Sequence, residues 1–155
     1  MSNRMTTAEA LQLYRHASIH ELGSLAHAAA AARHPRPIRT YVVDRNINYS
    51  NVCVAGCGFC NFKVRPGDQR GYVLATETLL AKIDELLAVG GTQVLLQGGL
   101  HPDLPLAWHE GLLRTIKSHA PSIHLHAFSP PEIVHLARTS GLSVRDVLAR
   151  LVEAG

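Results

Sequence analysis

Three cysteines lie close together in the first half of this 155-residue chain, and they are the residues best suited to chemistry. They are Cys53, Cys57 and Cys60, separated by three and then two residues, and the sequence holds no others. Three thiolates this close can hold one corner of a 4Fe-4S cluster, whereas clusters that only carry electrons usually have four. One iron then stays open, and S-adenosylmethionine is a cofactor that can occupy it and be split into a radical.

A structural zinc site is one alternative for these cysteines. Such sites use four closed ligands, commonly from paired cysteine spacings completed by Cys or His. The sequence has no second pair, and the candidate histidines, His34 and His101, are far away along the chain. Three unrelated buried cysteines are the other alternative, which their clustering disfavours. The spacing alone leaves both open.

The Cys-x3-Cys-x2-Cys pattern, with Phe59 before its last cysteine, resembles the signature of the radical S-adenosylmethionine superfamily. The flanking segments 43–52, 65–68 and 90–99 resemble the cyclic dehypoxanthinyl futalosine synthases, also called dehypoxanthine futalosine cyclases, of menaquinone biosynthesis. The resemblance runs along nearly the whole chain. Aminofutalosine synthases and deazaflavin chromophore synthases share much of this sequence, so they are the alternatives within the superfamily.

The resemblance implies a 4Fe-4S cluster held by Cys53, Cys57 and Cys60, with S-adenosylmethionine bound at its open iron. It also implies that the cofactor is contacted by Phe59 and by the stretch Gln97, Gly98 and Gly99, whose backbone would bind the methionine amino group. Leu100 stands where many members of the superfamily carry an acid, so only backbone contact is expected there. No general base is identified.

The activity implied by the resemblance is cyclisation of dehypoxanthine futalosine. The implied partners are this small nucleoside-derived substrate and an electron donor such as flavodoxin or ferredoxin. A full (β/α)8 barrel takes about 250 residues, whereas this chain has 155. A catalytically inactive iron-sulfur-binding fragment is therefore the alternative outside enzymes.

Composition limits the other classes of function. The net charge is +3, and the basic residues form no Lys/Arg run and no interleaving with aromatic residues, so nucleic-acid binding is not expected. No apolar run approaches the roughly 20 residues that span a bilayer. An odd number of clustered cysteines argues against a disulfide framework and for a reducing compartment. We therefore expect a cytoplasmic protein without membrane partners.

The elements that position the cysteines follow from periodicity and turn signals. Residues 6–17 and 18–33 are expected to form a helical pair, because Thr6-x-x-Glu9 and Ser18-x-x-Glu21 have capping-box spacing. Strands are predicted at 39–44, 93–97 and 123–127. Helices are predicted to follow each of them, the first with Thr76 as its cap and the others beginning near Pro105 and Ser129, with one more after Ser143.

This alternation predicts an α/β fold, a partial parallel TIM-type barrel of the radical S-adenosylmethionine superfamily with an N-terminal helical pair. The expected domains are residues 1–37 and 38–155. The cysteine loop would leave the carboxyl end of the first strand, where barrel active sites lie. His126 lies near the carboxyl end of the third predicted strand, and we expect it to face the interior. For Ser129 and Glu132 we expect a role as helix caps first and a role as ligands second.

Overall fold

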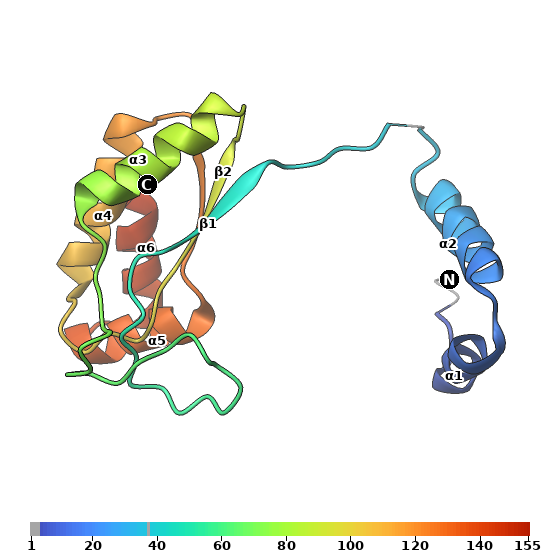
Figure 1. The fold of residues 1–155 in the computed structure, drawn as a ribbon, viewed down its shortest axis with the longest axis horizontal. Coiled ribbons are helices and arrows are strands. Elements are labelled where there is room, and N and C mark those ends of the chain that lie inside the picture. Colours follow the sequence, from blue (N-terminus) through green and yellow to red (C-terminus); the bar gives the residue numbers. More distant parts are fainter. Residues whose placement is uncertain (1–3, 37) are drawn as a thin grey trace. The chain divides into compact units, whose positions relative to one another are not determined.

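The structure is a computed structural model that describes residues 4–36 and 38–155. The chain divides between Tyr41 and Val42 into two compact units (Figure 1). Among the described residues, no helix combines the length and the apolar character that a bilayer span requires.

The first unit contains the predicted helical pair, α1 (Thr7–His16) and α2 (Ile19–Arg33). The capping box predicted at Thr6 and Glu9 is confirmed, whereas Ser18 and Glu21 form only one of its two bonds. The side chain of Glu9 accepts a hydrogen bond from the Thr6 backbone N–H at 2.7 Å, and Ser18 Oγ accepts one from the backbone N–H of Glu21 at 3.2 Å. These bonds satisfy N–H groups that a helix start otherwise leaves without partners.

The second unit is built from three strands and four helices. In chain order these are β1 (Asp44–Asn48), α3 (Thr76–Ala88), β2 (Gln93–Gln97), α4 (Leu106–His119), β3 (His124–Ala127), α5 (Pro130–Ser140) and α6 (Val144–Ala154). The strands form one parallel sheet in the order β1-β2-β3. Parallel strands joined through helices are the repeating unit of α/β barrels, so the predicted α/β class is confirmed.

One face of the sheet is apolar and packs against helices. Ile47, Val94 and Leu96 are fully buried in a core that includes Ile83 of α3 and Ile116 of α4. Figure 1 shows α3 and α4 on the same side of the strands. Burying an aliphatic side chain of this size contributes about 1.5–3 kcal/mol to folding, so this layer holds the three strands in register.

The opposite face of the sheet is polar. Register places Asp44 beside Gln93 and His124, and places Asn46 beside Leu95 and His126. Within the second unit nothing buries this face, since Asp44, Asn46, His124 and His126 are exposed and the others are half-buried. In a barrel this is the interior side, which is where His126 was predicted to lie.

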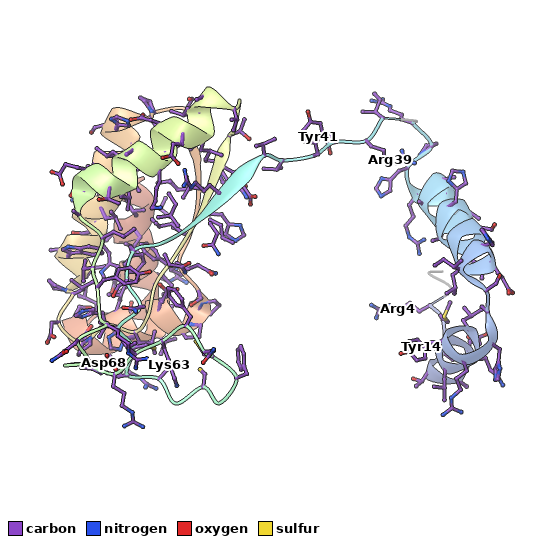
Figure 2. The ribbon with its side chains drawn as sticks, in the orientation of Figure 1. Arg4, Tyr14, Arg39, Tyr41, Lys63 and Asp68 are labelled. Atoms are coloured by element: carbon purple, nitrogen blue, oxygen red, sulfur yellow. The ribbon has the colours of Figure 1, made fainter. Side chains whose placement is uncertain are left out.

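Two local predictions are wrong. The first strand begins at Asp44, whereas residues 39–44 were predicted from their Thr, Tyr and Val content. Tyr41 is 87% exposed and projects from the chain (Figure 2), because the partner strand β2 begins only at Gln93, opposite Asp44. Thr76 is the first helical residue of α3 and not its cap, which is Ala75 without a side-chain hydrogen bond.

Candidate functional site

The cysteine segment begins at the carboxyl end of β1, as predicted. The chain leaves the strand through buried residues 49–52 and then reaches Cys53. Cys53 N–H donates to Val64 O at 2.9 Å, and Val64 N–H donates to Asn51 O at 2.9 Å. These two bonds close residues 53–64 into a loop whose base is fixed to the strand end.

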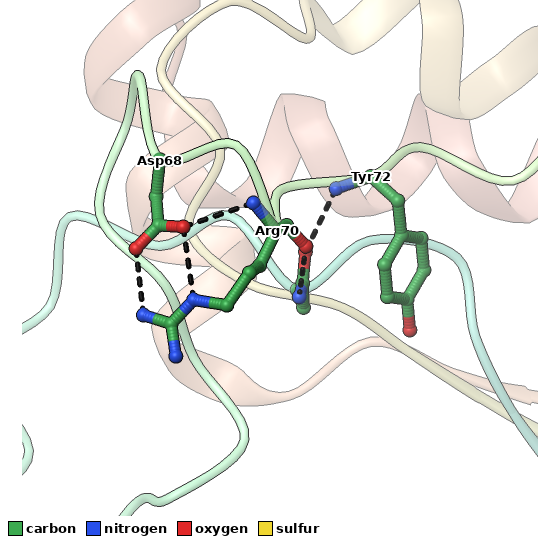
Figure 3. Close-up of polar contacts among 4 residues, drawn as sticks. Asp68, Arg70 and Tyr72 are labelled. Atoms are coloured by element: carbon green, nitrogen blue, oxygen red, sulfur yellow. Dashed lines mark hydrogen bonds and ion pairs between the residues drawn. The ribbon is translucent and has the colours of Figure 1, made fainter.

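Residues 68–72 brace the base of this loop (Figure 3). The side chain of Asn51 donates to Arg70 O at 3.0 Å and accepts from the Tyr72 N–H at 2.9 Å. Asp68 accepts two bonds from the Arg70 guanidinium at 2.7 and 3.0 Å, which lower the pKa of Asp68 to about 2. The Asn51 side chain therefore satisfies backbone groups at the base of the loop. These polar contacts hold the base in place.

The three thiols differ in their surroundings. Cys53 is half-buried, and its Sγ accepts hydrogen bonds from the N–H groups of Ala55 and Leu100, both at 3.3 Å. Cys57 is exposed, whereas Cys60 is half-buried. Cys53 is thus the most firmly anchored of the three thiols and Cys57 the most accessible.

A hollow of about 440 Å³ opens beside the loop. Cys53 and Cys57 line it together with Lys63 and Arg65, whereas Cys60 does not. Across the described ranges 4–36 and 38–155, no three His, Cys, Asp or Glu side chains are arranged to hold a metal ion. The structure therefore brings two of the three predicted ligands to one hollow and leaves the loop open.

The donor chemistry of the loop fits a 4Fe-4S cluster. Lys63 Nζ donates to Ala55 O at 2.7 Å, which places a positive charge at the hollow that Cys53 and Cys57 line. N–H groups that donate to the Cys53 sulfur are contacts of the kind that tune iron-sulfur clusters. An added Cβ on Gly56 or Gly58 would meet nothing within 4 Å, so the loop has room to close around a cluster.

The glycines after β2 lie directly against the start of the cysteine loop. A Cβ on Gly98 would lie 2.3 Å from the Tyr49 ring, and one on Gly99 would lie 2.1 Å from Val52 O. Val54 N–H also donates to Leu100 O at 3.1 Å. Only glycine permits Gly98 to lie this close to the Tyr49 ring and Gly99 this close to the Val52 backbone, so the two segments predicted to hold cluster and cofactor are adjacent.

The other two predicted cofactor contacts differ in exposure. Gln97 is the half-buried last residue of β2, on the polar face of the sheet. Phe59 is 93% exposed at the open side of the loop. Contacts of both residues with the cofactor stay predictions.

A buried carboxylate behind Gly98 belongs to the site, although the sequence patterns indicated it first as a cap. Glu132 Oε2 accepts bonds from the backbone N–H and the hydroxyl of Ser129, both at 2.7 Å, which confirms the predicted capping box. Glu132 Oε1 accepts from the Tyr49 hydroxyl at 2.7 Å and from the Gly98 N–H at 3.0 Å. The sequence signal for this second set of contacts was only that Ser129 and Glu132 follow the end of a strand.

His109 completes this buried cluster. Its Nδ1 lies 3.0 Å from Pro105 O, which can only accept, so Nδ1 carries a proton. Its Nε2 lies 3.3 Å from the Tyr49 hydroxyl. Burial lowers the pKa of His109, and burial together with the charge of Glu132 raises the pKa of Tyr49. Tyr49 therefore remains a protonated donor to Glu132.

The lowered pKa of His109 predicts a pH-dependent stability. The unfolded chain binds a proton at His109 near the ordinary value of 6.5, whereas the folded chain binds it only at lower pH. The stability that His109 contributes should be fully present above that value. The free energy of unfolding should then fall as the pH decreases toward the pKa that His109 has in the folded chain. Urea unfolding between about pH 5 and 7.5 measures this slope, and His109→Asn should flatten it. An unchanged slope in the variant would assign the effect to another group.

The comparisons with known proteins come from sequence and from structure. The family model described as "Radical SAM superfamily" matches residues 47–155. A protein of Halalkalibacterium halodurans named "Cyclic dehypoxanthine futalosine synthase" is 43% identical over 152 residues, which cover 98% of this chain and 41% of that protein. A Streptomyces coelicolor protein of the same name is 39% identical over 155 residues, covering 98% of this chain and 39% of the relative.

Two further similarities broaden this picture. A Nocardia farcinica protein named "FO synthase" is 47% identical over 116 residues, which cover 75% of this chain and 13% of that protein. Among solved structures, HydG, a maturase of the FeFe-hydrogenase, superposes with a TM-score of 0.61 at 16% identity over 99% of this chain and 41% of that chain. The similarity to HydG concerns the fold alone. The chain thus spans about two fifths of the futalosine synthases that it matches.

Proposed function

Because the chain belongs to the radical S-adenosylmethionine superfamily, we propose that it forms the cluster-binding part of an enzyme that cyclises dehypoxanthine futalosine to cyclic dehypoxanthinyl futalosine in menaquinone biosynthesis. The observation that carries the proposal is the three-cysteine loop at the carboxyl end of β1, packed against Gly98 and Gly99. The choice of substrate is supported by relatives of that name, which match 98% of the chain.

In this proposal Cys53, Cys57 and Cys60 hold a 4Fe-4S cluster. With S-adenosylmethionine bound, a cluster held there would supply radical chemistry directed at the substrate's ribose. The Gly98–Gly99 turn supplies backbone acceptors for the cofactor's amino group beside Cys53, with Gln97 and Phe59 as further proposed contacts. The polar face of the sheet, which includes Asn46 and His126, would line the chamber that orients the substrate.

The cellular location, the electron donor and the domain boundary are part of the same proposal. Free thiols must stay reduced to hold the cluster, which supports a cytoplasmic location and an electron donor such as flavodoxin or ferredoxin. Residues 1–37 are proposed as a helical segment that precedes the barrel portion 38–155. The division of the structure after Tyr41 supports a boundary close to this one.

Anaerobic reconstitution tests this proposal. The chain should bind iron and sulfide in the ratio of a 4Fe-4S cluster, and its visible and electron paramagnetic resonance spectra should change when S-adenosylmethionine is added. A chimera in which the remaining part of the Halalkalibacterium relative follows Gly155 should convert dehypoxanthine futalosine with release of 5'-deoxyadenosine, measured by mass spectrometry. No second substrate should be needed, because both reacting parts belong to one molecule.

Each outcome separates the alternatives. Turnover only with a chorismate-derived enol ether would reassign the chain to the aminofutalosine synthases, and formation of a deazaflavin chromophore would favour the FO synthases. Stoichiometric zinc without iron uptake would overturn the cluster itself. A cluster that never responds to S-adenosylmethionine would leave an inactive iron-sulfur-binding module.

A further inference from the structure

We infer that Glu132 is a positioning residue for S-adenosylmethionine, because its buried carboxylate fixes the Gly98–Gly99 turn relative to Cys53. The inference rests on the proposed function and deepens it. Glu132 is only 4% exposed and lies on the first turn of α5, outside the cysteine motif and the glycine stretch. It contacts no reacting atom in this role and acts through the backbone of Gly98.

One carboxylate joins the ends of all three strands. Tyr49, which donates its hydroxyl to Glu132, directly follows β1. Gly98, which donates its N–H, directly follows β2. Ser129, which donates twice, follows β3 by two residues. Because parallel strands all point the same way, these ends share one edge of the sheet, and Glu132 sets their spacing there.

The contact with Gly98 is transmitted to the cysteine loop over a short path. Gln97 O accepts from the Tyr49 N–H at 3.0 Å, so the peptide before Gly98 is held from both sides. Two residues later, Leu100 donates its N–H to Cys53 Sγ at 3.3 Å. A displacement of Gly98 would therefore change the distance between the turn and the sulfur that anchors the proposed cluster.

Hydrogen bonds hold the Gly98–Gly99 turn but leave one of its carbonyl oxygens free to accept a further bond. Gly99 O accepts from the His101 N–H at 2.9 Å, and Leu100 O accepts from the Val54 N–H at 3.1 Å. Within the part of the chain that the structure describes, Gly98 O accepts no hydrogen bond. By occupying the Gly98 N–H, Glu132 orients this residue while its carbonyl remains open to a donor such as an ammonium group.

Backbone strain next to Ser129 supports this role. Phe128 has a φ of 61°, a left-handed conformation that a bulky residue rarely adopts. Its N–H donates to Leu96 O at 2.9 Å, which ties the strained residue to β2. Strain of this kind is unfavourable and persists only where surrounding contacts fix it. Here the strained turn directs Ser129 and Glu132 back over the strand ends.

Glu132→Gln is the critical variant, because the carboxylate accepts from donors on both oxygens. A glutamine amide has one oxygen, so its NH₂ group must face either the Ser129 donors or Gly98 and Tyr49. We expect the reconstituted variant to keep its iron and sulfide but to need about tenfold more S-adenosylmethionine for half of the spectral change. In the cluster-free protein, the amide of Gly98 should exchange hydrogen faster than in the unaltered chain.

Glu110→Gln is the matched control. Glu110 is also buried, at 5% exposure, but its carboxylate accepts from Arg150 of α6, so this variant should lower stability without changing the titration with S-adenosylmethionine. If Glu132→Gln does not fold, Glu132→Asp keeps the charge on a shorter side chain and should also raise the cofactor requirement. Either Glu132 variant titrating within twofold of the unaltered protein would overturn the inference, and so would an equal shift in Glu110→Gln. An unaltered protein that loads a cluster without responding to the cofactor would overturn the proposed function first.

Discussion

Replacing Cys57 with alanine is expected to abolish cluster binding while leaving the fold in place. Cys57 is the exposed cysteine of the loop, so its removal takes no side chain from the core. Surface substitutions of this kind change stability by about 0.5 kcal/mol or less. The two remaining thiolates leave two irons of the cluster without protein ligands, and such a cluster is lost to solvent.

The measurement is iron and acid-labile sulfide per chain after anaerobic reconstitution, together with the thermal unfolding curve of the metal-free protein. Gly58→Ala is a suitable control in the same loop, because its added Cβ meets nothing within 4 Å. The control should load iron like the unaltered chain. Full iron and sulfide content in Cys57→Ala would show that the cysteines are not the ligand set proposed here.

Replacing Gly99 with alanine is expected to separate the cofactor turn from the cysteine loop. The added Cβ would lie 2.1 Å from Val52 O and 2.8 Å from Cys53 Cβ, so backbone must move on one side or the other. Overpacking of this kind costs about 1–3 kcal/mol. The shift is directed at Cys53, so we expect reduced stability and a loss of more than about tenfold in affinity for S-adenosylmethionine.

Gly111→Ala is the control that separates the effect on stability from the effect on cofactor affinity. Gly111 lies in the exposed interior of α4 and has no atom within 4 Å of an added Cβ. Alanine is favoured over glycine there, so this variant should be more stable by about 0.5–1 kcal/mol and should bind the cofactor normally. Unchanged unfolding and unchanged cofactor titration in Gly99→Ala would contradict the close contact of the two segments.

Sequence predicted β2 well and β1 poorly for one physical reason. The apolar run of β2 is bounded by Gly90-Gly91 and Gly98-Gly99, so local signals define both ends of Gln93–Gln97. Before β1, the residues 39–43 have strand propensity but no partner, since pairing starts where Asp44 meets Gln93. A strand is stabilised by its neighbour, and the position of that neighbour is not a local property.

In the candidate site, too, features with a local sequence signal were predicted, and contacts between distant residues were not. The cysteine spacing and the glycines after β2 were visible as patterns, and so was the capping bond between Ser129 and Glu132. The bonds from Glu132 to Gly98 and Tyr49 join residues 34 and 83 positions apart in the chain. No periodicity encodes such contacts, because they depend on how strand ends meet after the sheet has formed. The open arrangement of the three thiols likewise follows from the loop and not from spacing.

The polar inner face of the sheet bears on how such a protein is synthesised. Domains begin to fold from their N-terminal parts while the ribosome still adds residues. Strands whose two faces were both apolar would expose a sticky surface until later strands arrived to cover it. Here β1 and β3 present Asp44, Asn46, His124 and His126 to water, and their apolar side chains are covered by helices close to them in sequence. The nascent chain can therefore form this layer during translation without presenting a continuous apolar surface on that face.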